Sequence, residues 1–111
     1  MARTPEGAVK DKVTAILKKH GTYYFFPATG GLGRGGVPDI IACHRGGFIG
    51  IECKAGKGKT TALQDAELEK IGRAGGRALV IRETNIADVE KLLVAINNLD
   101  FIRTAHDPTN D

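Results

Sequence analysis

Two apolar segments, 37–43 and 48–54, flank the short sequence Arg45-Gly46-Gly47, and this arrangement constrains the fold more than any other feature. Both segments have the length and β-branched content of strands, and a glycine-containing turn between them is typical of a hairpin. A loop of two residues or of four gives the same register, in which residue 43 faces 48 and 41 faces 50. The sequence therefore predicts an antiparallel hairpin.

This register places two acids, Asp39 and Glu52, directly opposite each other on one face, whereas a loop of three or five residues would send them to opposite faces. Their Cβ atoms would lie about 4.5–5.5 Å apart, so the carboxylates repel one another unless something neutralises them. Strand periodicity puts Lys54 on the same face and turns the Cys53 side chain away. Such oxygen ligands suit Mg²⁺ or Mn²⁺, with a backbone carbonyl and water completing the coordination. Lys54 would then orient or deprotonate a water and stabilise charge on a phosphate.

A simpler interpretation of the same face is a cross-strand salt bridge, in which Lys54 pairs with either acid. On the spacing alone both interpretations stay open. Gly50, opposite Ile41, is expected to leave room for a substrate.

Helical and strand patterns surround the hairpin. Thr4-Pro5-Glu6 predicts a helix start, and apolar residues at helical spacing follow as far as Gly21. Further elements are a short aromatic strand at 22–27, a helix at 61–74, a strand at 77–82 and a last helix capped by Asn85. The order α-β-β-β-α-β-α predicts an α/β fold in which helices flank a mixed sheet.

Two polar residues share stripes with apolar ones and each has two interpretations. Glu6 faces inward at the start of the first helix, but an acid there also complements the helix dipole. Gln64 shares a stripe with Leu68 and Ile71, but it also completes a capping box that begins at Thr61. The two roles of Gln64 need not exclude each other.

The length of 111 residues fits one domain, which we expect to span 1–100, followed by a flexible polar tail at 101–111. The chain has no apolar run of the ~20 residues that a membrane span needs. Its two cysteines, Cys43 and Cys53, provide neither a disulfide framework nor a zinc site and fit a reducing cytoplasm.

Glycine is in excess, with 15 residues, and five of them surround Arg34 in the loop 30–36. Such a loop suits an arm that approaches phosphate, or alternatively a disordered connector. The net charge of +3 is small, but Arg34, Lys54, Lys57 and Lys59 gather around the acidic pair. We therefore expect Arg34, Lys57 and Lys59 to contact a polyanionic partner such as a nucleic acid; for the two lysines the alternative is a solvated linker.

Gly58-Lys59-Thr60 also resembles part of a phosphate-binding P-loop. That motif requires glycine five positions before Gly58, where this chain has Cys53, and the strand at 77–82 carries no acid for Mg²⁺. We therefore expect no nucleotide cofactor.

Val37-Pro38-Asp39 followed by Glu52-Cys53-Lys54 resembles the PD-(D/E)XK nuclease signature. With Glu6, Gln64 and the glycine loop, the layout from about residue 4 to 97 resembles the VRR-NUC (virus-type replication-repair nuclease) family, in its stand-alone form from phages and bacteria. The archaeal Holliday-junction resolvases are similar in layout and size.

The resemblance implies a PD-(D/E)XK core and metal-dependent hydrolysis of DNA phosphodiesters. It implies Mg²⁺ or Mn²⁺ held by Asp39, Glu52 and the Cys53 backbone carbonyl, with Lys54 positioning water. Glu6 would hold a water or a second ion, and Gln64 would support the attacking water or Lys54. It also implies a homodimer that cuts four-way junctions in the cytoplasm of a bacterial or phage-infected cell.

Two further hypotheses stay open: a non-catalytic DNA-binding module on the same fold, and a non-specific DNA nuclease. The complete set of Asp39, Glu52 and Lys54 argues against the first. For a dimer, the candidate interface residues are the apolar ones of the first helix and of the aromatic strand.

Overall fold

The computed structural model describes residues 3–28 and 34–105, the side chains of 101–105 excepted. Its elements follow the predicted order, and their bounds are α1 Pro5–Lys19, β1 Tyr23–Phe25, β2 Ile40–His44, β3 Gly47–Cys53, α2 Ala62–Arg73, β4 Arg77–Ile81 and α3 Ala87–Ala105. The strands form one mixed sheet in the order β1-β2-β3-β4, with antiparallel pairs up to β3 and β4 parallel to β3. The predicted α/β fold with helices flanking a mixed sheet is confirmed.

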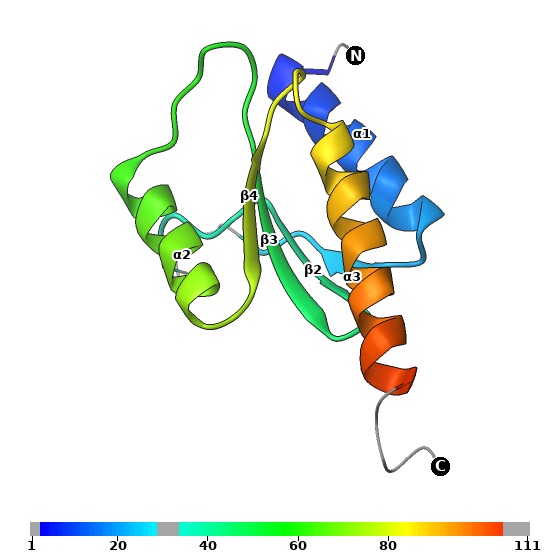
Figure 1. Ribbon diagram of the computed structural model, residues 1–111. Coiled ribbons are helices and arrows are strands. Elements are labelled where there is room, and N and C mark those ends of the chain that lie inside the picture. Colours follow the sequence, from blue (N-terminus) through cyan, green and yellow to red (C-terminus); the bar gives the residue numbers. More distant parts are fainter. Residues whose placement is uncertain (1–2, 29–33, 106–111) are drawn as a thin grey trace.

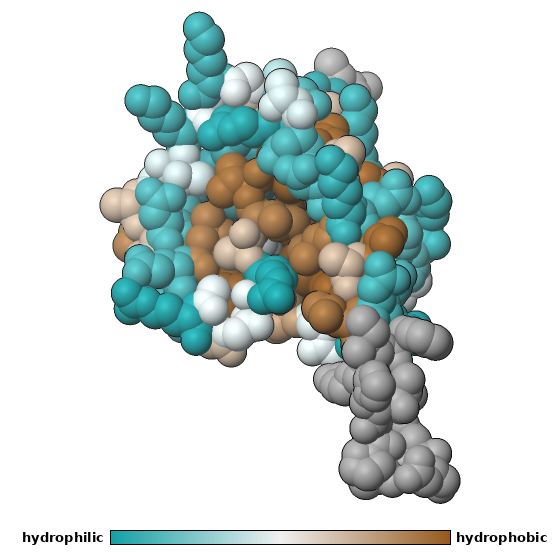
Figure 2. All heavy atoms as spheres, in the orientation of Figure 1, coloured by the Kyte–Doolittle hydropathy of each residue, from teal (hydrophilic) through white to brown (hydrophobic). Residues whose placement is uncertain are grey.

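The helices lie on the two faces of this sheet, with α2 on one face and α1 and α3 on the other (Figure 1). Strands β3 and β4 are parallel, and parallel neighbours need a long crossover connection, which helix α2 provides here. Strand β4 is an edge of the sheet. Apolar side chains gather on the face of the molecule between α2 and α3, where β4 runs (Figure 2).

The hairpin has the predicted register, in which Ile41 faces Gly50 and Cys43 faces Phe48. Its turn consists of Arg45 and Gly46, with φ angles of 47° and 85°. Two positive φ angles match a type I′ turn, whose twist agrees with that of the flanking strands. The turn thereby fixes the register. This register brings the start of segment 37–43 and the end of segment 48–54 together at the end of the hairpin that lies away from the turn.

The core lies between the sheet and the pair α1 and α3. Three residues of the apolar stripe of α1 are fully buried there, together with side chains of β3 and α3: Val9, Val13, Leu17, Ile49, Ile51, Val89 and Leu93. The expectation that the apolar residues of α1 form a dimer interface is therefore wrong, because these residues already pack in the core. On β1, Tyr23 and Phe25 remain exposed.

Gly50 does not leave room for a substrate, contrary to expectation. A Cβ atom at this position would lie 2.5 Å from Ile71 Cδ1 and 3.2 Å from Pro38 Cγ. The missing side chain instead lets α2 and the segment before β2 pack closely on the sheet.

Two boundaries also differ from the sequence prediction. Asn85 does not cap α3, which begins at Ala87: its Oδ1 accepts a hydrogen bond from the Arg82 amide, and its Nδ2 donates one to the Val80 carbonyl. Helix α3 runs to Ala105, so residues 101–105, which the sequence prediction places in the tail, are helical. The rest of that tail, 106–111, lies outside the described residues, and the single-domain boundary near residue 100 stays a prediction.

The segment that leads into β2 passes close to the first turn of α2. Gly36 has a φ of +84°, and a Cβ atom there would overlap the Leu63 carbonyl. Glycine is required for both reasons, conformation and close backbone approach. Gly30, Gly31 and Gly33 of the glycine loop lie outside the described residues.

We predict that Gly36→Ala destabilises the fold more than Gly21→Ala. Gly21 has a similar φ of +68°, but a Cβ atom there would meet nothing within 4 Å, so its substitution costs only the left-handed conformation, about 1–2 kcal/mol. Gly36→Ala adds the backbone overlap and should cost at least about 2 kcal/mol more. Urea unfolding of both variants measures the difference, and equal losses would contradict the close approach.

Candidate active site

Asp39 and Glu52 lie at the same end of the hairpin, away from its turn. Asp39 directly precedes β2, and its Oδ2 accepts a hydrogen bond of 2.9 Å from the Cys53 amide on β3. Glu52 is the residue before Cys53, and its charge interacts with that of Asp39. The predicted juxtaposition of the two acids is thus present in the structure.

Glu52 is a buried carboxyl group, with 1% of its surface exposed, and its Oε2 atom has no hydrogen-bond partner among the described residues. Burial, and after it the neighbouring Asp39 carboxyl, raises the pKa of Glu52 to about 8. At neutral pH this site therefore retains a proton, or requires a cation in its place.

Lys54 is half-buried beside the two acids and follows the last residue of β3. Its amide donates a hydrogen bond to the Ile81 carbonyl, which ties the position to the end of β4. Its charge lowers the pKa of Glu52, but less than burial and Asp39 raise it. Among the ion pairs between described residues none involves Lys54, so the plain salt bridge of the simpler interpretation is not formed.

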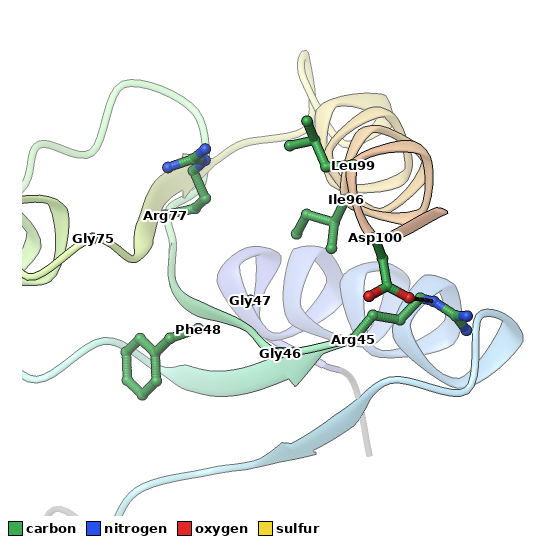
Figure 3. A pocket seen from close by; sticks show the side chains of 9 residues that line it. All are labelled: Arg45, Gly46, Gly47, Phe48, Gly75, Arg77, Ile96, Leu99 and Asp100. Atoms are coloured by element: carbon green, nitrogen blue, oxygen red, sulfur yellow. Dashed lines mark hydrogen bonds and ion pairs between the residues drawn. The ribbon is translucent and has the colours of Figure 1, made fainter. Parts of the chain in front are cut away.

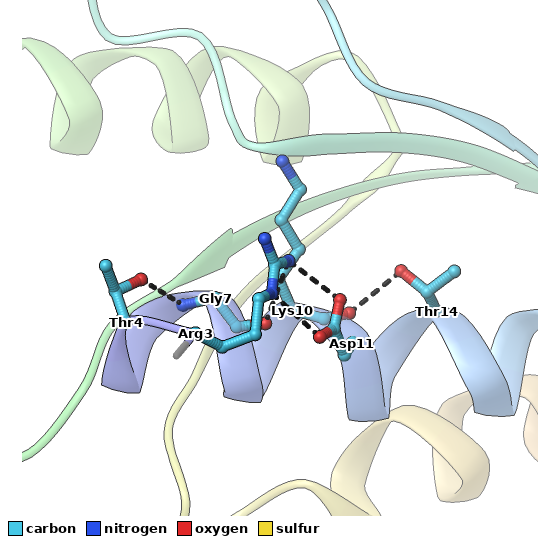
Figure 4. Close-up of polar contacts among 6 residues, drawn as sticks. All are labelled: Arg3, Thr4, Gly7, Lys10, Asp11 and Thr14. Carbon is cyan, nitrogen blue, oxygen red and sulfur yellow. Dashed lines mark hydrogen bonds and ion pairs between the residues drawn. The ribbon is translucent and has the colours of Figure 1, made fainter. Parts of the chain in front are cut away.

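An open groove of about 480 Å³ borders Asp39. Glu6 lines it from the first turn of α1, and its charge contributes to the raised pKa of Glu52. Glu6 is also the acid in the first turn of a helix capped by Thr4, whose Oγ1 accepts the Gly7 amide (Figure 4). Both interpretations of Glu6 are therefore compatible with its position.

Lys10 is a residue of this groove that the sequence reasoning missed. It lies one helical turn after Glu6, and its Nζ is 4.2 Å from the centre of the Phe26 ring. Its side chain points from α1 toward the strands, away from the Arg3–Asp11 ion pair on the helix surface (Figure 4). The spacing of four residues from Glu6 is the signal that indicates a shared face.

Gln64 occupies its predicted place in a capping box. The side-chain Oε1 of Gln64 accepts a hydrogen bond of 2.9 Å from the Thr61 backbone amide. The Gln64 backbone amide in turn donates one of 3.2 Å to Thr61 Oγ1. The residues that line the groove beside Asp39 do not include Gln64. Capping is thus confirmed, and a part in catalysis stays a prediction.

The donor set at this end of the sheet fits a hard divalent cation better than zinc. No group of three or more His, Cys, Asp or Glu side chains that could hold a metal occurs within residues 3–28 and 34–100, so an ion here would have at most two carboxylates and a backbone carbonyl as protein ligands. Mg²⁺ commonly binds through one or two carboxylates and keeps several waters. Glu52 Oε2, buried and unpartnered, is the atom that such an ion would satisfy.

Cys53 donates its backbone amide to Asp39, while its thiol lies on the core side of the sheet. Its side chain belongs to the hydrophobic core, and burial, followed by the charges of Asp39 and Glu52, raises the pKa of the thiol to about 12. It therefore stays a neutral thiol, facing away from the two acids as the strand periodicity predicts.

The predicted DNA-binding residues have different surroundings. Lys57 and Lys59 are exposed on the loop between β3 and α2. This loop is anchored, because the Gly56 amide donates to the Glu83 carboxylate and Arg82 donates to the Gly56 and Gly58 carbonyls. Arg34 forms an ion pair with the buried Glu67 of α2, a partner that the sequence reasoning missed.

A separate pocket lies at the opposite end of the sheet, beside the hairpin turn (Figure 3). Arg45 forms a 2.9 Å ion pair with Asp100 there, and Phe48, Arg77, Ile96 and Leu99 contribute to its walls. None of the sequence-predicted site residues lines it, so it is distinct from the candidate active site.

Comparisons with known proteins agree with this architecture. A solved structure described as "VRR_NUC domain" superposes with a TM-score of 0.65 at 23% identity, over 82% of this chain and 96% of that one. The fold is therefore that of the VRR_NUC nuclease domain, which confirms the resemblance seen in the sequence. No curated protein matches the chain.

The family follows from a second comparison. The sequence profile described as "Archaeal holliday junction resolvase (hjc)" matches residues 7–101. The chain belongs to this family, and it is a nuclease. Within the described residues no helix has the length and apolar character that crossing a membrane requires.

We predict that the metal-free protein loses stability as the pH rises from about 5 to 8. Because the folded state holds the Glu52 proton up to about pH 8 and the unfolded chain releases it near its ordinary pKa, folding is favoured at the acid end of this window. The loss should be on the order of 1–3 kcal/mol after allowance for solvent screening. Thermal unfolding in a chelator at several pH values measures it.

Glu52→Gln is the control, because it keeps the shape and removes the titrating proton. Its stability should change little over the same window. A wild-type protein whose stability rises steadily from pH 5 to 8 would contradict a raised Glu52 pKa.

Proposed function

We propose that this nuclease is a metal-dependent, structure-selective DNA endonuclease that resolves four-way junctions as a homodimer. The observation that carries the proposal is the acid pair at the end of β3. Asp39 is held by the Cys53 amide, and Glu52 lies buried with an unpartnered oxygen. A buried carboxylate beside a second acid costs stability unless a cation or a proton neutralises it.

Asp39, Glu52 and the Cys53 carbonyl are the groups that would hold Mg²⁺ or Mn²⁺. When bound, such an ion polarises a phosphoryl oxygen and makes water a better nucleophile at neutral pH. The chain's own residues then orient the substrate and move protons. Asp39, fixed by its hydrogen bond, presents a carboxylate of constant orientation at the edge of the groove.

Lys54 is the residue we assign to positioning the attacking water and stabilising charge on the phosphate. It is half-buried, and no acid among the described residues neutralises it in an ion pair. Glu6 and Lys10 line the groove together, so an acid that accepts hydrogen bonds from water and a cation that attracts phosphate lie on one helix face. Gln64 would support the water through the part of its amide that capping leaves free.

The dimer is proposed because a junction requires two symmetrical nicks and each chain provides one acid pair. A two-fold pair of chains supplies two sites of matched polarity. Two exposed apolar surfaces suit the second copy: the face over the edge strand β4 (Figure 2), and the aromatic residues Tyr23, Phe25 and Phe48.

DNA would contact three exposed cations: Arg34, Lys57 and Lys59. The anchored loop that carries the two lysines favours this role over that of a solvated linker. The compartment we propose is the cytoplasm of a bacterial or phage-infected cell, where the free thiols of Cys43 and Cys53 stay reduced.

We predict that Asp39→Asn and Lys54→Met each lower the cleavage rate on a labelled four-way junction by at least about 10²-fold with Mg²⁺ or Mn²⁺. Asn removes the charge of one ligand, and Met keeps the length of the lysine without its ammonium group. Lys18→Met, at the exposed far end of α1, is the matched control and should cut at the wild-type rate. Product mapping should show paired, symmetrical nicks.

Each alternative function has its own outcome in this assay. Tight junction binding without cleavage in any divalent metal would indicate a non-catalytic DNA-binding module. Equal rates on linear duplex and on the junction would indicate a non-specific nuclease.

A further inference from the structure

Glu67 is a buried acid in the middle of α2 that the proposed chemistry does not use. Only 5% of its surface is exposed, and it lines an apolar hollow of about 400 Å³ between α2 and the sheet. Pro38, Ile41, Phe48 and Ile71 are among the other residues of this hollow. A carboxylate in such surroundings is costly unless a cation pairs with it.

That cation is Arg34, which belongs to the segment leading into β2. Its Nε lies 2.5 Å from Glu67 Oε1, yet 76% of the Arg34 side chain remains exposed. Lys70 lies farther from the carboxylate, at 3.7 Å from Oε2. The Nε side of the guanidinium is therefore in ionic contact with the buried carboxylate, while most of the side chain is open to solvent.

This ion pair lies on the path to the acid pair. Two residues after Arg34, Gly36 passes against the backbone of α2, and Pro38 then packs near Gly50. The next residue is Asp39, whose carboxylate is tied to the Cys53 amide. Arg34 is therefore anchored at one end of a short, tightly packed segment whose other end is the metal-binding acid.

We propose that Glu67 is a positioning residue for DNA: it holds Arg34 by its Nε so that the two Nη groups face outward as a fork for a backbone phosphate near Asp39. Arginine suits this arrangement because its five donors lie in one rigid plane, so fixing one edge fixes the other. A guanidinium held in this way loses less side-chain entropy when a phosphate binds. The inference rests on the proposed function, since it requires DNA at the groove.

The direction in which DNA affinity changes when the Glu67 charge is removed distinguishes a positioning role from simple electrostatic repulsion. Glu67 is a negative charge near the path of a polyanion, so Coulomb repulsion alone predicts that its removal tightens DNA binding. Positioning predicts the opposite, because Arg34 without its partner samples many orientations. The same carboxylate therefore gives opposite results under the two accounts.

The experiment measures the dissociation constant for a labelled four-way junction in a chelator, at several salt concentrations. We expect Glu67→Gln and Arg34→Ala each to weaken binding about tenfold and the double variant to bind no more weakly than Arg34→Ala. Arg34→Lys should not restore binding, because lysine lacks the planar fork. The slope of log affinity against log salt should become shallower by about one unit for both single variants, because each variant loses about one phosphate contact.

Two variants separate positioning from folding. Glu69→Gln removes a negative charge from the exposed face of the same helix, where Glu69 pairs with Arg73, and should bind as the wild type or slightly tighter. Glu67→Met fills the apolar hollow without a charge, and because the Arg34 side chain is mostly exposed, this change leaves no unpaired charge buried. We expect Glu67→Met to melt near the wild-type temperature and still to bind DNA about tenfold more weakly.

The inference is overturned if Glu67→Gln or a folded Glu67→Met binds DNA as tightly as the wild type or tighter, or if the effects at Arg34 and Glu67 add. In that case the wild type still binds, and the proposed function stands. Failure of the wild type itself to bind the junction would overturn the proposed function and this inference together.

Discussion

The hydrogen bond from the Cys53 amide to the Asp39 carboxylate is the interaction on which the arrangement of this protein depends. It joins the residue before β2 to the last residue of β3 and holds Asp39 beside Glu52. Because Glu52 is buried, its charge is costly there, and its pKa rises to about 8. A stable fold has thus placed a buried, poorly neutralised acid beside Asp39, which borders the groove on α1.

The surrounding elements keep this end of the sheet in place. The type I′ turn at Arg45 and Gly46 sets the strand register, and the absence of a side chain at Gly50 lets α2 approach the sheet. On the other side, the Lys54 amide bonds to Ile81, and the loop after it is tied to Arg82 and Glu83. Glu52 belongs to β3, and Asp39 and Lys54 lie directly beside strand ends, which favours fixed geometry over loop adaptability.

The sequence alone was sufficient to predict those features of the structure that depend on residues close together in the chain. Turn length and alternation gave the register that opposes Asp39 and Glu52, and the capping box at Thr61 and Gln64 needs only four residues. It was insufficient where two distant segments meet. Glu67 lies on a helix with many charges and resembles a solvated residue until Arg34 and the sheet enclose it, and the space at Gly50 is filled by Ile71 from another element. Asn85 has the composition of a helix cap, but the end of β4 uses its side chain.

The most direct test of the account is the number of protons released when Mn²⁺ binds. Titration calorimetry at pH 7 in buffers of different ionisation enthalpy should show release of close to one proton per chain, because a Glu52 with a pKa of about 8 is mostly protonated at that pH. The release should fall toward zero near pH 9 and be absent in Glu52→Gln. Absence of Mn²⁺ binding by the wild type, or binding at pH 7 with a heat that does not depend on the buffer, would contradict a cation site built on this buried acid pair.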